Sequence, residues 1–170
     1  MATTITAGNA TNGLAFSADN TGILELKTGT GAGTTAVTIS TAQAVSIPGN
    51  LSFNSGYGSS AVAYGCRAWV NFDGTGTVAI RASGNVTSIT DNATGDYTVN
   101  FTTAMPDANY AIVGTSGFTS NGTSAGWLAT NRIGASGNES APTTTSCRIN
   151  GVNQAGSVFD TKYMQVSIFR

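Results

Sequence analysis

Apolar and polar residues alternate without interruption between residues 66 and 73. One set of alternate positions holds Cys66, Ala68, Val70 and Phe72. The other set holds Arg67, Trp69, Asn71 and Asp73. Such alternation is typical of a β-strand with one buried and one exposed face. We therefore predict a half-buried strand over 66–73.

A turn signal follows this strand, and the alternation then resumes. Residues 73–76 read Asp-Gly-Thr-Gly, and Val78, Ile80 and Ala82 come after them at alternate positions. A register that keeps both apolar sets on one face pairs Phe72 with Val78, Val70 with Ile80 and Ala68 with Ala82. It also sets Trp69 opposite Arg81 on the outer face, where the two side chains either stack or cover a packing or subunit contact.

The rest of the chain after Tyr64 continues this strand-and-turn pattern. The expected strands are 66–73, 77–84, 86–91, 96–102, 108–116, 146–152 and 162–169. The segment 117–146 is rich in Gly, Ser, Thr and Asn, and we expect one short strand in it around Trp127. Helix-forming residues are scarce throughout the chain. We therefore predict an all-β protein whose residues 64–170 form a small antiparallel β-sandwich head.

The first 53 residues show a different pattern, in which the apolar residues come as isolated pairs between turns. The pairs are Leu14 with Phe16, Leu24 with Leu26, Val37 with Ile39, Val45 with Ile47, and Leu51 with Phe53. Strands with such narrow apolar stripes cannot enclose a core by themselves. We expect identical chains to supply the neighbours, so that residues 1–53 form the β-prism stem of a homotrimer. A monomeric sandwich is the alternative. Residues 54–63 are expected to form a Gly/Ser linker.

Composition narrows the possible partners. Only 9% of the residues are charged and the net charge is -1, so the chain lacks the basic clusters that bind nucleic acid. No apolar run approaches the roughly 20 residues of a transmembrane helix, so we expect no membrane insertion. The first residues have neither a basic nor an apolar leader region, and we therefore expect synthesis in a cytoplasm.

The sequence offers no set of catalytic residues. There is no histidine, which excludes Ser-His-Asp and Cys-His sites within one chain. Glu25 and Glu139 are the only glutamates, and no carboxylate pair suited to glycoside hydrolysis can be nominated. Asp91 and Asp96 could hold calcium in a hairpin turn, but turn chemistry alone explains both residues. We predict that the protein is not an enzyme and holds no cofactor or metal.

The two cysteines, Cys66 and Cys147, each begin a predicted strand. They could form a disulfide if these strands are neighbours. Assembly in a reducing cytoplasm favours free thiols instead.

One group of residues has the chemistry of a carbohydrate site. Sugars are bound by aromatic faces and by short planar polar groups, and Trp127, Asn131 and Arg132 lie together in the 117–146 segment. The alternative is that Trp127 packs on the sandwich or at a trimer contact.

Several segments together resemble a known family. They are Arg67–Phe72, the hairpin from Ser88–Asp91 to Gly95–Phe101, the turn Ala104–Asp107 before Tyr110, and Val166–Arg170. They resemble the C-terminal domain of bacteriophage tail-fibre proteins, which is frequent in phages of marine and freshwater bacteria, including cyanophages. The resemblance covers 64–170 and is weak in 117–146.

This resemblance implies a trimeric, non-enzymatic component exposed on the virion, with a head that contacts the host surface, in particular its polysaccharide. The N-terminal region is then expected to bind other virion proteins. We see no long N-terminal anchoring domain or coiled-coil shaft, so a fibre tip, a short baseplate-attached fibre and a capsid decoration protein all stay open. A decoration protein would stabilise the particle without binding a receptor. A self-assembling bacterial surface filament is a further alternative, which the missing export signal disfavours.

Overall fold

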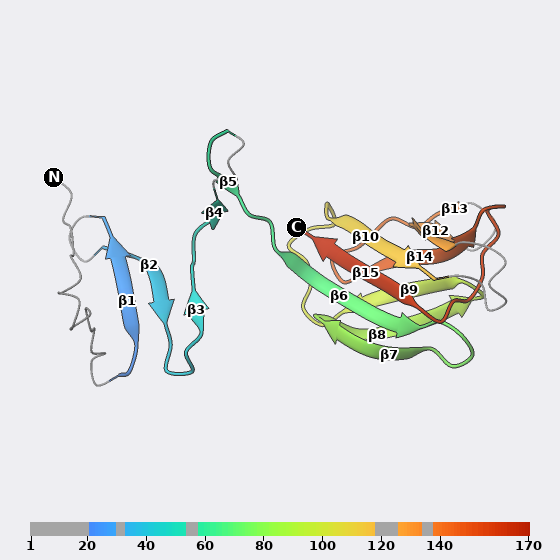
Figure 1. Ribbon diagram of the computed structural model, residues 1–170, viewed down its shortest axis with the longest axis horizontal. Coiled ribbons are helices and arrows are strands. Elements are labelled where there is room, and N and C mark those ends of the chain that lie inside the picture. Colours follow the sequence, from blue (N-terminus) through green and yellow to red (C-terminus); the bar gives the residue numbers. More distant parts are fainter. Residues whose placement is uncertain (1–20, 30–32, 54–57, 118–125, 134–137) are drawn as a thin grey trace, which may run out of the picture. The chain divides into compact units, whose positions relative to one another are not determined.

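A computed structural model describes residues 21–29, 33–53, 58–117, 126–133 and 138–170 of the chain. These residues form antiparallel β-sheets, so the all-β prediction is confirmed (Figure 1). They contain no helix that could cross a membrane. The chain divides into two compact units, residues 1–63 and residues 64–170, which we call the N-terminal unit and the head.

The described residues of the N-terminal unit form five short strands. A three-stranded sheet is formed by β1 (Leu24–Thr28), β2 (Thr34–Ile39) and β3 (Val45–Ser46). A separate pair is formed by β4 (Ser52–Phe53) and β5 (Ala61–Val62). The expected linker 54–63 is therefore wrong at residues 61 and 62, because their backbone pairs with β4. Residues 54–57 of that linker, and the apolar pair Leu14 and Phe16, lie outside the described residues.

The three-stranded sheet has one apolar and one polar face. Residues directly opposite each other in adjacent strands share a face. The pairings Leu24–Ile39, Leu26–Val37 and Ile39–Val45 therefore place these five side chains together. The other face carries Glu25, Thr38 and Ser46. Within the described part of the N-terminal unit no side chain is buried, and Leu26 and Val45 are 50% and 62% exposed.

The head consists of two four-stranded antiparallel sheets. The first has the order β10-β15-β6-β7, with β10 Ala111–Ser116, β15 Met164–Phe169, β6 Cys66–Asp73 and β7 Ala79–Gly84. The second has the order β11-β14-β9-β8, with β11 Gly126–Thr130, β14 Ser146–Asn153, β9 Asp96–Phe101 and β8 Val86–Ala93. A short hairpin, β12 (Arg132–Ile133) with β13 (Asn138–Glu139), was not expected. All seven expected strands are present, and the short strand around Trp127 is β11.

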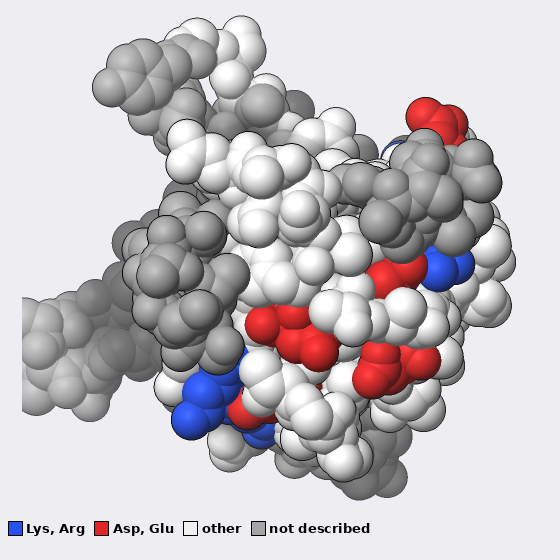
Figure 2. All heavy atoms as spheres, turned by 90° about the vertical axis from the view of Figure 1, so that its right-hand side faces the viewer, with Lys and Arg blue, Asp and Glu red and all other residues white. Residues whose placement is uncertain are grey.

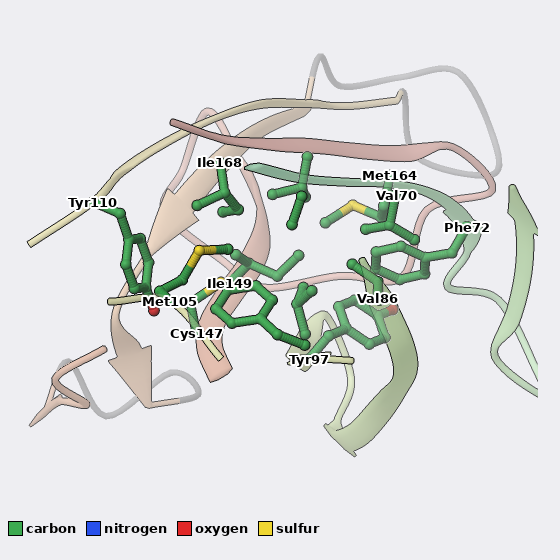
Figure 3. Close-up of a cluster of buried hydrophobic side chains, with 14 residues drawn as sticks. Val70, Phe72, Val86, Tyr97, Met105, Tyr110, Cys147, Ile149, Met164 and Ile168 are labelled. Atoms are coloured by element: carbon green, nitrogen blue, oxygen red, sulfur yellow. The ribbon is translucent and has the colours of Figure 1, made fainter. Parts of the chain in front are cut away.

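The core of the head lies between these two sheets (Figure 3). The first sheet contributes Val70, Phe72, Met164 and Ile168, while the second contributes Val86, Tyr97, Cys147 and Ile149. Phe72 and Tyr97 meet across the interface edge to face, with ring centroids 5.2 Å apart. In β6 and β15 buried residues alternate with more exposed ones, so these strands turn one face to the core.

The predicted register of the first hairpin is wrong. The structure pairs Phe72 with Ile80, Val70 with Ser83 and Trp69 with Gly84, and a register shift lies between Asn71 and Phe72. This irregularity places one more residue on β7 than a regular ladder would hold, which the alternation of the sequence cannot reveal. Arg81 consequently does not face Trp69. It forms an ion pair with Asp73 at 2.7 Å and lies over the Tyr163 ring, 4.7 Å from the centroid.

The expectation of free thiols is confirmed, because neither cysteine forms a disulfide. Cys66 is exposed on β6, whereas Cys147 is buried on β14. Burial raises the pKa of the Cys147 thiol to about 12.

One end of the head is closed by a set of hydrogen bonds between loops. We call it the loop end; it contains the β6–β7, β8–β9 and β14–β15 connections. The Tyr97 hydroxyl is buried 2.7 Å from Asp160 Oδ1 and 2.9 Å from the Gly74 carbonyl oxygen, and it can donate to either. The Gly95 N–H donates to the same Asp160 oxygen at 2.6 Å. Seen from this end in Figure 2, acidic groups form separate areas on a largely uncharged surface.

Candidate functional site

The head has a pocket of about 400 Å³ lined by Tyr64, Asn109, Ala111, Phe169 and Arg170. Ala111 begins β10 and Phe169 ends β15, and the two residues are directly opposite each other in the first sheet. Tyr64 precedes β6 and is 75% exposed. The pocket therefore combines two aromatic rings with an amide and a guanidinium group. Its volume lies within the roughly 300–1,000 Å³ that is usual for small-ligand sites.

The guanidinium group of this pocket is held in place by Asp107. Arg170 Nε donates to Asp107 Oδ1 at 2.9 Å and Nη2 donates to Oδ2 at 2.5 Å. The backbone N–H of Asn109 also donates to Asp107, at 2.8 Å. The hydrogen bonds from Arg170 and Asn109 lower the pKa of Asp107, and the same contact with Asp107 raises the pKa of Arg170. The pair is thus fully ionised and neutral as a whole, while other N–H groups of Arg170 stay free to donate.

Trp69 lies on the outer face of the same sheet. Its neighbours across the two adjacent strands are Ser167 on β15 and Gly84 on β7. The indole lies over Gly84, because a β-carbon at residue 84 would be 2.5 Å from Trp69 Nε1. Trp69 is nevertheless 43% exposed. Val113, opposite Ser167, is 58% exposed and extends this row to the edge strand β10.

The residues proposed from sequence as a carbohydrate site are spread along one strand and its end. Trp127 is on β11 opposite Val152 and is 49% exposed. Asn131 follows β11 with a left-handed backbone, φ 59°, and its N–H donates to the Arg148 carbonyl oxygen. Asn131 lies four positions after Trp127, which corresponds to about 13 Å along an extended strand. Arg132 begins β12, opposite Glu139, and its side chain lies outside the described part of the structure.

The outer face of the second sheet is polar, and its side chains bind one another. Arg148 donates to both carboxylate oxygens of Asp96 at 2.7 Å. Asn100 donates to the hydroxyl oxygens of Ser88 and Thr90 on the adjacent strand. The hydrogen-bonding groups of this face are thus largely engaged within the sheet. On the outer face of the first sheet, Trp69 has only small residues directly opposite it, while an Arg81–Asp73 ion pair and a Thr115–Gln165 hydrogen bond engage polar side chains elsewhere.

Four aspartates of the head have structural partners. Asp73, Asp96 and Asp107 each pair with an arginine, and Asp160 accepts hydrogen bonds from Gly95 and Tyr97. The expected hairpin position of Asp96 is correct, but its carboxylate binds Arg148. Across the described residues, no group of three or more Cys, Asp or Glu side chains is placed to hold a metal ion.

Comparisons with known proteins give one structural likeness. No protein-family model and no curated protein matches the chain. Among solved structures it is similar to the phiAB6 tailspike in complex with three-repeated oligosaccharides of Acinetobacter baumannii surface polysaccharide, with 14% identity and a TM-score of 0.44. The match covers 98% of this chain and 30% of the tailspike chain. The chain therefore spans less than a third of the length of that protein.

The pocket residues were missed by the sequence analysis for a clear reason. Arg170 and Asp107 are 63 residues apart, and only the pairing of β10 with β15 brings their segments together. A weak signal was available, since Tyr64 precedes the expected first strand of the head and Phe169 ends the expected last strand. Trp69 was noted, but the wrong register gave it the wrong neighbour.

Proposed function

We propose that the chain is a structural subunit of a bacteriophage virion, a tail fibre or fibre tip that attaches the particle to host-surface polysaccharide without catalysis. In this proposal the N-terminal unit associates with two further copies of the chain and with other virion proteins. The head is the part that is presented to the host.

The observation that carries this proposal is the apolar face of the β1–β2–β3 sheet, on which Leu26, Ile39 and Val45 are exposed in the described part of the N-terminal unit. Leu24, Leu26, Val37, Ile39 and Val45 share that face. Burial of such side chains in identical neighbours would stabilise an assembly by roughly 1.5–3 kcal/mol for each side chain that becomes fully buried. The head needs no such help, because its two sheets already enclose a core. A fibre subunit requires one part that assembles with other chains, here the N-terminal unit, and one part that folds around its own core, here the head.

Further support comes from the surface chemistry. The head has a net charge of zero, from six basic and six acidic residues, and it carries exposed aromatic rings, among them Tyr64, Trp69 and Trp127. Aromatic faces and planar polar groups suit the alternating C–H and hydroxyl surfaces of sugars. Four of the aspartates of the head, Asp73, Asp96, Asp107 and Asp160, are engaged in structural contacts, which supports binding rather than hydrolysis. These features fit the resemblance of residues 64–170 to phage tail-fibre heads.

A capsid or baseplate decoration protein is the second candidate. The same apolar face supports it, since this face could bind another virion protein. The two proposals differ in what the loss of the head would change: adsorption to the host for a fibre, and particle stability for a decoration protein.

The assembly step can be tested with two neighbouring substitutions on β3. Val45→Lys puts a charge on the apolar face, whereas Ser46→Lys puts the same charge on the polar face. We expect the wild type and Ser46→Lys to have three times the mass of one chain by light scattering, and Val45→Lys to be a monomer. A wild-type monomer would contradict the trimer.

Attachment requires a separate measurement. We expect the trimer to bind host cells and their extracted surface polysaccharide, and to compete with phage adsorption. A trimer that binds no host envelope fraction, in a virion that loses stability without it, would favour the decoration protein.

A further inference from the structure

We infer that the pocket and Trp69 form one extended site for a neutral carbohydrate on the outer face of the first sheet. This inference rests on the proposed function and specifies which surface performs it and which class of sugar it takes. It replaces Trp127, on the opposite sheet, as the principal aromatic contact.

The pocket and Trp69 are neighbours on one face. Ser167 is directly opposite Trp69, and Phe169 lies two residues further along the same strand. The β6–β15 ladder has an irregularity between Ile168 and Phe169, so that Phe169 is opposite Cys66 and Arg67 has no partner on β15. The β10–β15 ladder is regular there, and it places Phe169 on the same face of β15 as Ser167. A ligand that fills the pocket at Phe169 can therefore continue along this face onto the indole. Ser167 and Gly84, directly opposite Trp69, are small, and Arg67 is exposed.

The neighbours of Trp69 fix its ring as a platform. The indole covers Gly84, where a β-carbon would lie 2.5, 2.9 and 3.3 Å from Nε1, Cδ1 and Cε2. One side of the ring rests on the backbone of β7, and the indole stays 43% exposed. An aromatic ring that is held flat and open on one side can stack on the C–H face of a sugar with little loss of side-chain freedom.

The polar groups of the pocket supply hydrogen bonds without net charge. Asn109 offers an amide that can donate and accept, and Arg170 offers the N–H groups that Asp107 does not use. Because Asp107 fixes the guanidinium at two atoms, its orientation is set before the ligand binds. Within the pocket, the same carboxylate neutralises the charge of Arg170, so an anionic sugar gains no uncompensated cation there. The chemistry of the pocket favours neutral pyranoses over uronic or sialic acids.

The two tryptophans make a direct test possible in the full chain. The probes are the methyl glycosides of glucose, galactose, mannose and N-acetylglucosamine, with glucuronic acid as the charged counterpart. Binding is followed by the NMR signals of the Trp69 and Trp127 indole N–H groups and of Arg170 Nε. We expect at least one neutral glycoside to shift the Trp69 and Arg170 signals and to leave the Trp127 signal unchanged.

Matched variants then compare the aromatic residues of the proposed site with aromatic residues elsewhere on the head. Trp69→Ala and Tyr64→Ala should each weaken binding about tenfold, which is what losing one aromatic contact costs. Trp127→Ala and Tyr163→Ala remove aromatic residues of similar exposure, 49% and 51%, and should leave the affinity unchanged.

Several results would overturn the inference. One is that no neutral glycoside shifts the signals, and another is that glucuronic acid binds more tightly than the neutral glycosides. A third is that only Trp127→Ala loses binding. A fourth is that Trp69→Ala dissociates the trimer, which would identify this surface as a subunit contact. If the wild-type trimer adsorbs to the host and both Trp69→Ala and Tyr64→Ala adsorb equally well, the inference fails while the proposed function stands. If the wild type does not adsorb at all, the proposed function itself fails.

Discussion

The indole of Trp69 occupies the space that a side chain at Gly84 would need: a β-carbon at residue 84 would lie 2.5 Å from the indole Nε1. The two residues are directly opposite each other in β6 and β7. Because Gly84 has no side chain, the Trp69 ring can lie over β7 with part of its surface exposed to solvent.

Gly84→Ala should displace the Trp69 indole from β7. Because the ring is partly exposed it can swing outward, so we expect a loss in unfolding free energy of no more than about 1–2 kcal/mol. The fluorescence of Trp69 should shift towards that of a solvated indole. It is measured in a Trp127→Phe background, where Trp69 is the sole tryptophan. Gly49→Ala is the control, since nothing lies within 4 Å of its β-carbon position. Unchanged fluorescence in Gly84→Ala would contradict the platform geometry.

Gly95→Ala should be strongly destabilising because two effects combine at the loop end. Gly95 has φ +65°, and an added β-carbon would lie 2.3 Å from the backbone nitrogen of Phe159. Gly76→Ala is the matched control, since Gly76 has φ +62° and nothing within 4 Å. We expect about 1–2 kcal/mol for the backbone strain at Gly76 and at least about 3 kcal/mol at Gly95, by urea unfolding. Equal losses would show that the loop around Phe159 yields without cost.

Tyr97→Phe should weaken the closure of the loop end. The substitution keeps the ring that packs on Phe72 and removes only the buried hydroxyl near Asp160 and the Gly74 carbonyl. Leaving these acceptors with one donor fewer should cost about 1–3 kcal/mol of unfolding free energy. Hydrogen exchange of the Gly95 amide, which donates to Asp160, should also become faster. A variant as stable as the wild type, with unchanged exchange, would contradict this role of the hydroxyl.

The stability of the head should fall in alkaline solution. The folded state raises the pKa of Cys147 from 9.0 to about 12, and it also raises the pKa values of Tyr97 and Tyr110. In each case burial favours the neutral form, so the stabilisation is complete below the unfolded pKa and is lost as the pH rises above it.

Urea unfolding between pH 8 and pH 11 tests this dependence. For Cys147 the loss should begin near pH 9 and follow a slope of up to one proton, which is about 1.4 kcal/mol per pH unit. Cys147→Ala removes this contribution and should flatten the curve between pH 9 and the onset of tyrosine ionisation near pH 10. Cys66→Ala, at the exposed cysteine, is the control and should leave the slope unchanged. Identical curves for all three proteins would contradict the assignment.

Much of this fold was determined locally. The alternation in 66–73 correctly placed Ala68, Val70 and Phe72 in the core, because successive residues of a strand point to opposite faces. Turn residues such as those at 73–76 marked the ends of strands, and the scarcity of helix formers set the fold class. These properties depend on residues close together in the sequence, so the sequence alone was sufficient for them.

The tertiary structure decided the register and the candidate site. At the turn the register already differs from the predicted one by two residues, because Phe72 pairs with Ile80, and the irregularity between Asn71 and Phe72 adds a third, so that Trp69 faces Gly84 and not Arg81. Both features depend on the packing of the two strands. The pocket brings Tyr64, Asn109 and Arg170 together from three distant segments, and the pairing of β10 with β15 fixes its far wall. The sequence by itself determined which strands form and which face of each is buried. Only their long-range pairing decided which exposed side chains share a surface, because contacts between distant segments leave no periodic pattern in the chain.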